Sequence, residues 1–158
     1  MRRGLKTIVY ADAAGKVPPA VQQHLEEAGY RLICHTDGSS VLWDCENRPP
    51  HLLILDSRLR DMDGMDVCGY LRESPVCPDL PILMLTEPDD EMARAYARQM
   101  ADYVGADFFL AKPYDPNVLL QLIDDIVRGT AQRGQSRVKF PTRVVWPTNC
   151  VKSMVRMI

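Results

Sequence analysis

Long apolar stretches are absent from this 158-residue sequence. No run approaches the roughly 18 apolar residues that a membrane-spanning helix requires, and the first residues lack the apolar core of a signal peptide. The five cysteines are odd in number and include no Cys-x-x-Cys pair, which argues against a disulfide framework or a zinc site. These absences predict a cytoplasmic protein with reduced thiols and no membrane interaction.

Acidic residues are absent from the end of the chain. Residues 1–128 carry 13 Lys and Arg against 21 Asp and Glu, whereas residues 129–158 carry six basic residues and no acidic one. This change predicts a domain over residues 1–128, followed by a basic tail or linker that could also be a truncated output segment. No helix-turn-helix or other DNA-reading module is recognisable, so nucleic acid binding is not indicated for the domain.

Short apolar segments alternate with amphipathic ones along the first 128 residues. The apolar segments predict five β-strands, over residues 5–11, 30–35, 52–55, 82–86 and 106–111. Each is followed by a turn and by apolar residues at helical spacing. Alternation of strand and helix with short connections predicts a flavodoxin-like (βα)5 fold, a doubly wound parallel sheet of strand order 2-1-3-4-5.

Polar residues mark the ends of several predicted helices. Asp37 or Ser39 caps the second helix, and Asp115 caps the last one, which Gly129 ends. A long helix is predicted over residues 88–103, where a proline and three acids favour a helix start.

Chemically useful side chains follow four of the predicted strands. Asp12 and Asp56 come at the ends of the first and third strands, and Thr86 and Lys112 come at the ends of the fourth and fifth. Parallel strands present their carboxyl ends at one edge, where such sheets bind ligands. Two carboxylates suit Mg²⁺, while a hydroxyl and an ammonium suit a phosphoryl group. The sequence therefore predicts a site for phosphoryl transfer.

Four motifs in this order carry a family resemblance. They are Leu-Ile-Leu-Asp at residues 53–56, Asp-Gly-Met at 63–65, Ile-Leu-Met-Leu-Thr at 82–86 and Gly-Ala-Asp-Phe-Phe-Leu-Ala-Lys-Pro at 105–113. With them, residues 5–128 resemble the receiver domain of bacterial two-component response regulators.

The resemblance implies a role for each residue of the site. Asp56 would accept a phosphoryl group from a histidine kinase or phosphotransfer protein. Asp12, Asp56 and the backbone carbonyl of Arg58 would hold Mg²⁺. Lys112 would pair with the phosphoryl oxygens. The domain would be no metabolic enzyme and would at most catalyse its own phosphorylation and dephosphorylation.

The resemblance also implies how the signal leaves the site. Thr86 would hydrogen-bond to the phosphoryl group, and Phe109, at the aromatic switch position, would turn inward. This change would remodel the face near the fourth and fifth helices, where a downstream protein, an output domain or a second copy could bind. The Lys112–Pro113 bond is expected to be cis.

The sequence departs from the family pattern at the acidic site. Ala11 replaces the first of two adjacent acids, so binding of Mg²⁺ is expected to be weak. Two hypotheses address the change: Arg58 pairs with Asp56 and partly replaces the cation, or Glu87 points inward as a substitute ligand. A third interpretation leaves both long side chains in solvent.

Two other functions compete with a phosphorylated receiver. One is a pseudo-receiver, whose altered site is not phosphorylated and which acts as a protein-docking module. The other is a hydrolase or flavin-binding protein of the same fold. Against the latter, the sequence has no D-x-D that begins at Asp56, the end of the third strand, no G-x-S-x-G motif and no phosphate-binding Gly-rich loop.

Overall fold

One parallel β-sheet organises the protein. The computed structural model describes residues 4–86 and 105–129. Its elements, in chain order, are β1 (Thr7–Ala11), α1 (Pro19–Glu27), β2 (Arg31–His35), α2 (Gly38–Asn47), β3 (Leu52–Asp56), α3 (Gly64–Glu73), β4 (Ile82–Thr86), β5 (Phe108–Ala111) and α5 (Pro116–Arg128). The helix predicted over residues 88–103, Glu87, and residues 130–158 of the tail lie outside the described residues.

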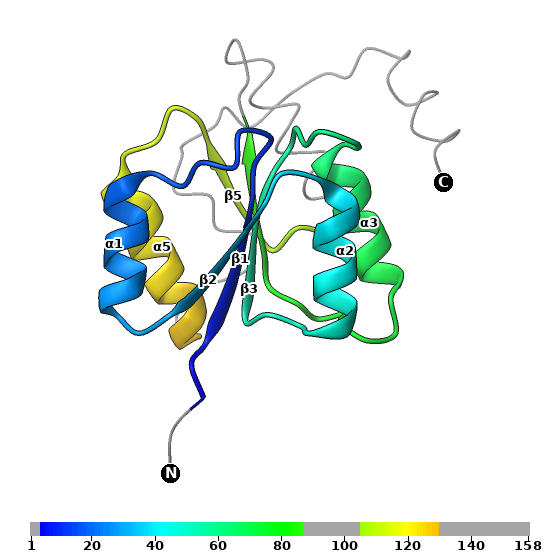
Figure 1. Cartoon of the computed structure of the whole chain (residues 1–158), viewed down its shortest axis with the longest axis horizontal. Helices are drawn as coiled ribbons and strands as arrows, with labels where there is room; N and C mark the ends of the chain where they lie inside the picture. Colours follow the sequence, from blue (N-terminus) through cyan, green and yellow to red (C-terminus); the bar gives the residue numbers. More distant parts are fainter. Residues whose placement is uncertain (1–3, 87–104, 130–158) are drawn as a thin grey trace, which may run out of the picture.

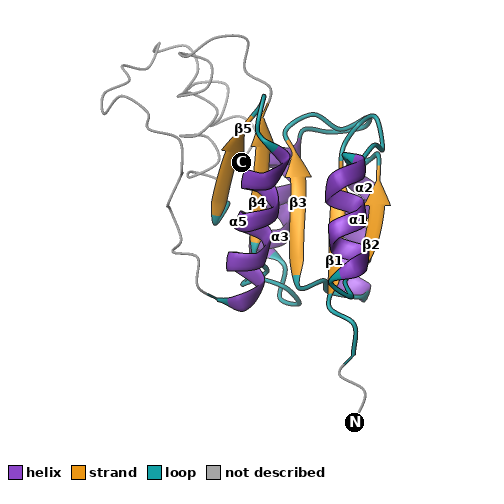
Figure 2. Ribbon diagram, turned by 90° about the vertical axis from the view of Figure 1, so that its left-hand side faces the viewer, coloured by secondary structure: helices purple, strands orange, loops and turns teal. Residues whose placement is uncertain are grey.

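The strand order confirms the predicted topology. The five strands lie in the order β2-β1-β3-β4-β5 and every pair is parallel (Figure 2). Helices α1 and α5 cover one face of the sheet, while α2 and α3 cover the other (Figure 1). This is the doubly wound arrangement of a flavodoxin-like fold. Among the described helices, none is long and apolar enough to cross a membrane.

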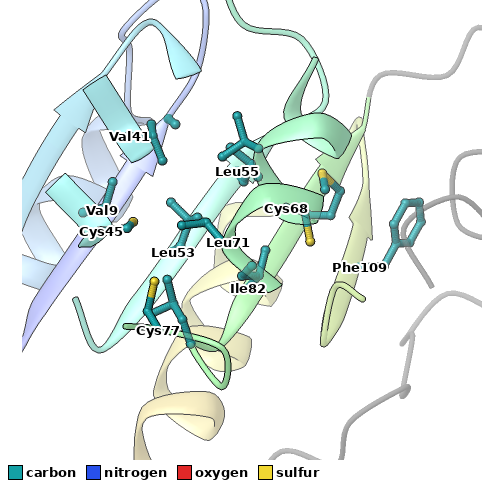
Figure 3. Packing of buried hydrophobic residues seen from close by; sticks show 14 of the residues in the cluster. Val9, Val41, Cys45, Leu53, Leu55, Cys68, Leu71, Cys77, Ile82 and Phe109 are labelled. Atoms are coloured by element: carbon teal, nitrogen blue, oxygen red, sulfur yellow. The ribbon is translucent and has the colours of Figure 1, made fainter. Parts of the chain in front are cut away.

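Side chains from each strand alternate between two hydrophobic cores. The first core lies against α2 and α3 and includes Val9, Leu53 and Leu55 (Figure 3). The second core lies against α1 and α5 and includes Ile8 and Ile54. Because successive residues of a strand point to opposite faces, a strand covered on both sides must be apolar throughout. All five residues of β3 are accordingly buried, including Asp56.

The first core also contains most of the described cysteines. Cys45, Cys68 and Cys77 are buried and Cys34 is exposed, and none of these four described cysteines is in a disulfide. Burial raises the pKa of Cys45 to about 12 and that of Cys68 to about 11. These two thiols are therefore protonated packing residues near neutral pH.

Polar side chains fix the starts of the helices. Asp37, rather than Ser39, caps α2 by accepting a hydrogen bond from the backbone N–H of Ser40 at 2.8 Å. Asp115 caps α5 in the same way through the N–H of Asn117 at 2.9 Å. Gly129 ends α5 with a left-handed φ of 75°, a conformation that glycine adopts without strain. These boundaries agree with the predicted signals.

An arginine holds the N-terminal side of β5 in place. The guanidinium of Arg72, on α3, donates to the carbonyls of Gly105 at 2.7 Å and Leu80 at 2.8 Å. It also forms an ion pair with Asp107 at 2.7 Å. The same Asp107 oxygen accepts a hydrogen bond from the N–H of Ile82 at 3.0 Å. This arginine cluster joins α3 to the starts of β4 and β5.

Candidate functional site

The strand register brings four predicted residues to one edge of the sheet. Asp56 is the last residue of β3 and pairs with Leu85 of β4. Thr86 ends β4 in register with Ala111, the residue before Lys112. Asp12 directly follows β1, the other neighbour of β3. The predicted constellation is therefore placed at the carboxyl edge.

The carboxylate of Asp56 is bound on both oxygens. Its Oδ2 accepts a hydrogen bond from Nζ of Lys112 in an ion pair, and its Oδ1 accepts one from the backbone N–H of Arg58 at 2.9 Å. The two side chains are only 4% and 18% exposed, respectively for Asp56 and Lys112. A carboxylate this deeply buried requires such compensation, because desolvation otherwise disfavours its charged form.

The second carboxylate is fixed by its own loop. Oδ1 of Asp12 accepts a hydrogen bond from the N–H of Ala14 at 2.8 Å. The backbone N–H of Asp12 donates to the carbonyl of His35, on the edge strand β2, at 3.1 Å. Asp12 is thus fixed at the end of β1, the strand that pairs with β3. The preceding residue, Ala11, is completely buried in the first core and offers no ligand.

The structure tests the hypothesis about Arg58 but not the one about Glu87. Among the described residues, the Arg58 side chain is exposed and forms no ion pair with Asp56; its contact with that carboxylate is through the backbone N–H. Lys112 is the cation against Asp56. Glu87 lies outside the described residues, so its role as a substitute ligand stays a prediction.

The oxygen ligands fit a weakly held magnesium ion. Within residues 4–86 and 105–129, no three His, Cys, Asp or Glu side chains are grouped to hold a metal. Mg²⁺, however, commonly takes one or two carboxylates and completes its shell with water and phosphate oxygens. Asp12 and Asp56 supply two carboxylates at one edge. Their hard oxygen chemistry therefore suits Mg²⁺.

The bond after Lys112 matches its expectation, and Phe109 lies in the first core. Phe109 is 5% exposed in the first core, at the β5 end of the cluster (Figure 3), in register with Met84. The Lys112–Pro113 peptide bond is cis. A movement of Phe109 on phosphorylation stays a prediction.

Arginine and aspartate contacts between the site loops were not predicted from the sequence. The Nε–H of Arg60 donates to the carbonyl of Ala13 at 3.0 Å, which joins the loop after β3 to the loop after β1. Asp61 accepts hydrogen bonds from the N–H groups of Gly38 at 2.6 Å and Ser39 at 3.1 Å. The hydroxyl of Ser39 and these backbone groups lower the pKa of Asp61. These contacts connect loops that are distant in sequence, so no local sequence pattern predicts them.

Known proteins provide an independent comparison. Residues 8–124 match the family described as the response regulator receiver domain. The chain belongs to this family. This receiver domain is similar to the alkaline phosphatase synthesis transcriptional regulatory protein PhoP of Bacillus subtilis (strain 168), with 32% identity over 123 residues. The match covers 78% of the chain and 49% of that relative, so the chain spans about half the length of the curated relatives it matches.

Solved structures support the same assignment. A response regulator of Chloroflexus aurantiacus J-10-fl shares 30% sequence identity and a TM-score of 0.69, over 78% of this receiver chain and 98% of that one. The chemotaxis response regulator CheY4 of Vibrio cholerae shares the fold, with a TM-score of 0.67 at 24% identity, over 77% and 98% of the two chains.

Proposed function

We propose that this receiver domain accepts a phosphoryl group on Asp56 from the phosphohistidine of a histidine kinase or phosphotransfer protein in the cytoplasm. The observation that carries the proposal is the buried Asp56–Lys112 ion pair at the sheet edge where β1 delivers Asp12. A buried acid with one cation against it has both a nucleophilic oxygen and a partner for incoming charge.

The chemistry uses groups that are already in contact. One carboxylate oxygen of Asp56 attacks phosphorus, and an O–P bond forms as the N–P bond of the donor breaks. The bonding electron pair leaves with the imidazole nitrogen, which takes a proton from solvent. The ammonium of Lys112 lies against Asp56 and stabilises the phosphoryl oxygens as charge develops on them. Water attack on phosphorus later restores the carboxylate.

Mg²⁺ is the cofactor that this chemistry calls for. Asp12, Asp56 and the backbone carbonyl of Arg58 would hold it, and Glu87 is a further candidate. The ion would neutralise charge on the transferred group. With Ala11 in place of an acid, we expect millimolar affinity, which calorimetric titration of Mg²⁺ into wild type and Asp12→Asn measures.

Phosphorylation would be transmitted through the neighbouring strand ends. An acyl phosphate adds roughly two negative charges and three acceptor oxygens next to β4 and β5. The hydroxyl of Thr86 gains a strong hydrogen-bond acceptor, and Phe109 repacks within the first core. The surface near the fourth and fifth helices then binds a downstream protein, an output domain or a second copy of the chain.

Phosphorylation by a small donor tests the proposal. Wild type and Asp56→Asn are incubated with Mg²⁺ and acetyl phosphate, and their intact masses are compared. We expect one phosphoryl adduct on wild type and none on the variant. An unmodified wild type would contradict the proposal, as would an equal adduct on Asp56→Asn.

A pseudo-receiver is the second candidate, and Ala11 favours it. A fully buried alanine occupies the position of an expected acid, so one metal-directing carboxylate is missing. Such a domain would bind its partner in one conformation regardless of phosphodonor. An absent adduct, together with an unchanged amide NMR spectrum on adding beryllofluoride and Mg²⁺, would support this function over phosphorylation.

A further inference from the structure

Arg60 contacts two other loops at the edge of the sheet that carries the candidate site. It lies in the loop after β3, the strand that ends with Asp56. Its Nε–H donates to the carbonyl of Ala13, in the loop after β1, at 3.0 Å. Its backbone N–H donates to the carbonyl of Thr36, in the loop after β2, at 3.1 Å. One residue therefore joins the loops that follow three neighbouring strands of the sheet.

The backbone from which this arginine extends is itself held in place. The next residue, Asp61, accepts hydrogen bonds from the N–H groups of Gly38 at 2.6 Å and Ser39 at 3.1 Å, at the start of α2. A side chain on a fixed backbone loses less conformational freedom when it forms a bond. The guanidinium is also planar, so its Nε–H has a defined direction. The side chain of Arg60 is thus well placed to hold the loop after β1.

The bond from Arg60 ends on the peptide group that also binds the carboxylate of Asp12. The carbonyl of Ala13 and the N–H of Ala14 belong to one planar peptide unit. Its oxygen accepts from Arg60 at 3.0 Å, and its N–H donates to Oδ1 of Asp12 at 2.8 Å. The N–H of Gly15 donates to the carbonyl of Asp12 at 2.9 Å and closes the turn. A rotation of this peptide would disturb both bonds, so Arg60 and Asp12 constrain the same group.

Asp12 lies where the pairing of β1 with β3 has just ended. The paired residues of the two strands run to Ala11 and Leu55, and Asp12 and Asp56 are the next residue of each segment. The geometry between the two carboxylates therefore depends on how the loop after β1 is held. Mg²⁺ requires close to octahedral geometry, so an ion bound by both carboxylates is sensitive to their spacing.

We propose that Arg60 is a positioning residue whose Nε–H fixes the peptide between Ala13 and Ala14, and so holds the carboxylate of Asp12 in the orientation that binds Mg²⁺ together with Asp56. The inference deepens the proposed function and rests on it where Mg²⁺ and phosphoryl transfer are concerned. Arg60 acts through the peptide and does not itself touch the cation or the phosphoryl group. Loss of its donor frees the turn without removing a carboxylate from the site.

Two neutral substitutions separate the hydrogen bond of Arg60 from its charge. In Arg60→Gln, the amide Nε2 is the same number of bonds from Cα as the arginine Nε, so an N–H donor is kept at the same reach. Arg60→Met has a side chain of similar length without a donor. Both variants lack the positive charge, which by itself repels Mg²⁺. A difference between these two variants therefore reports the hydrogen bond alone.

Amide hydrogen exchange measured by NMR tests the turn directly. We expect the N–H of Ala14 to exchange about threefold to tenfold faster in Arg60→Met than in Arg60→Gln, the range that one hydrogen bond supports. The N–H of Leu53, which donates to the carbonyl of Pro81 at 3.0 Å in the first core, should exchange equally in both. Equal exchange of Ala14 in the two variants would overturn the proposal, as would an equal acceleration at Ala14 and Leu53.

Calorimetric titration of Mg²⁺ connects the turn to the site. We expect the Kd for Mg²⁺ to be about threefold to tenfold higher in Arg60→Met than in Arg60→Gln. Arg31, exposed at the start of β2, provides the matched control pair, because Arg31→Met and Arg31→Gln should bind Mg²⁺ equally. A faster exchange of Ala14 with equal Mg²⁺ affinity in the two Arg60 variants would contradict the positioning of Asp12.

Phosphorylation by acetyl phosphate distinguishes a failure of this inference from a failure of the proposed function. At Mg²⁺ concentrations below the Kd, we expect Arg60→Met to be phosphorylated about threefold to tenfold more slowly than Arg60→Gln. If wild type takes no phosphoryl group while Ala14 exchange and Mg²⁺ affinity still differ between the variants, the proposed function fails and the positioning stands. If wild type is phosphorylated but the two variants match in exchange and in affinity, the positioning alone fails.

Discussion

The Asp56–Lys112 ion pair matters both for the stability of the fold and for the proposed reaction. The position of Asp56 as the last residue of a strand covered on both faces buries the carboxylate, and burial makes the ammonium of Lys112 necessary for a charged acid. The same pair is what a phosphoryl group would meet. A residue suited to react is thus held in place by an interaction that also contributes to stability.

Removing the cation should therefore destabilise the fold in a way that depends on Asp56. We expect Lys112→Met to lower the free energy of unfolding by about 1–3 kcal/mol, because a buried carboxylate loses its charged partner. In an Asp56→Asn background the same substitution should cost clearly less. Urea unfolding of the four proteins in a double-mutant cycle measures the coupling. Equal losses in both backgrounds would show that the ion pair is unimportant for stability.

Gly64 is required by close contact with the strand that bears Asp56. A Cβ at this position would lie 2.1 Å from the backbone oxygen of Asp56 and 3.1 Å from the Cα of Ser57. We expect Gly64→Ala to lower the free energy of unfolding by about 3 kcal/mol, since the contact is with backbone that cannot rotate away.

A second glycine of α3 provides the control for Gly64. A Cβ at Gly69 would meet no atom within 4 Å, so Gly69→Ala should raise the free energy of unfolding by about 0.5–1 kcal/mol through helix propensity. Urea unfolding compares both variants with wild type. Similar effects of the two substitutions would contradict the assigned contact at Gly64.

Besides the two hydrophobic cores, charged side chains with partners in several segments join the elements. The arginine cluster around Arg72 is the clearest example. Its guanidinium binds Leu80 in the segment before β4, and Gly105 and Asp107 in the segment before β5. We expect Arg72→Met to lower the free energy of unfolding by about 2–4 kcal/mol, since it leaves Asp107 buried without its cation. Urea unfolding measures the loss.

The neighbouring acid is the control for Arg72. Glu73 is exposed on the same helix, and Glu73→Ala should change the free energy of unfolding by no more than about 0.5 kcal/mol. If Arg72→Met lowered the free energy of unfolding as little as Glu73→Ala, the contacts of Arg72 would not stabilise the fold as proposed.

A buried carboxylate joins α2 to the edge strand β2. Asp44, whose side chain is 5% exposed, is hydrogen-bonded to Nε2 of His35 and forms an ion pair with Arg48 at 2.6 Å. Although burial acts in the opposite direction, the hydrogen bonds from Arg48 and His35 hold the pKa of Asp44 below its usual value. Because its pKa is lower in the folded state, ionised Asp44 stabilises the fold. This contribution is complete above the unfolded pKa of about 3.9 and is lost as the pH falls through the folded-state pKa.

The stability difference between wild type and Asp44→Asn should therefore depend on pH. At pH 5 we expect the variant to be less stable by about 1 kcal/mol, a modest value because solvent screens the mostly exposed Arg48. Below about pH 4 the difference should shrink. Urea unfolding between pH 3 and 5 measures it, with the exposed Asp79→Asn as control. A difference that grows on acidification would have the wrong sign.

At the scale of the molecule, the sheet and its reactive edge follow from local sequence patterns. Apolar runs that end in polar residues identify the strands, and parallel topology then brings Asp12, Asp56, Thr86 and Lys112 to one edge. The first residue of a strand is less predictable, because it depends on pairing: β5 begins at Phe108 rather than at residue 106. The topology of the fold could therefore be predicted from the sequence, and so could the capping residues of α2 and α5.

Interactions between distant segments were not predictable from one sequence. Arg72 reaches Asp107 across 35 residues, and Asp61 reaches Gly38 across 23. An arginine on a helix or an aspartate in a loop fits the local pattern whether or not such a partner exists, so only the folded arrangement assigns these roles.

The central claim is that Asp56 carries the phosphoryl group, and locating that group tests it most directly. Protein treated with acetyl phosphate and Mg²⁺ is reduced with borohydride, which converts an aspartyl phosphate to homoserine, and the modified residue is found by peptide mass spectrometry. We predict homoserine at position 56 alone, and none without the phosphodonor. Homoserine at another acid, such as Asp12, or at no position would contradict the account.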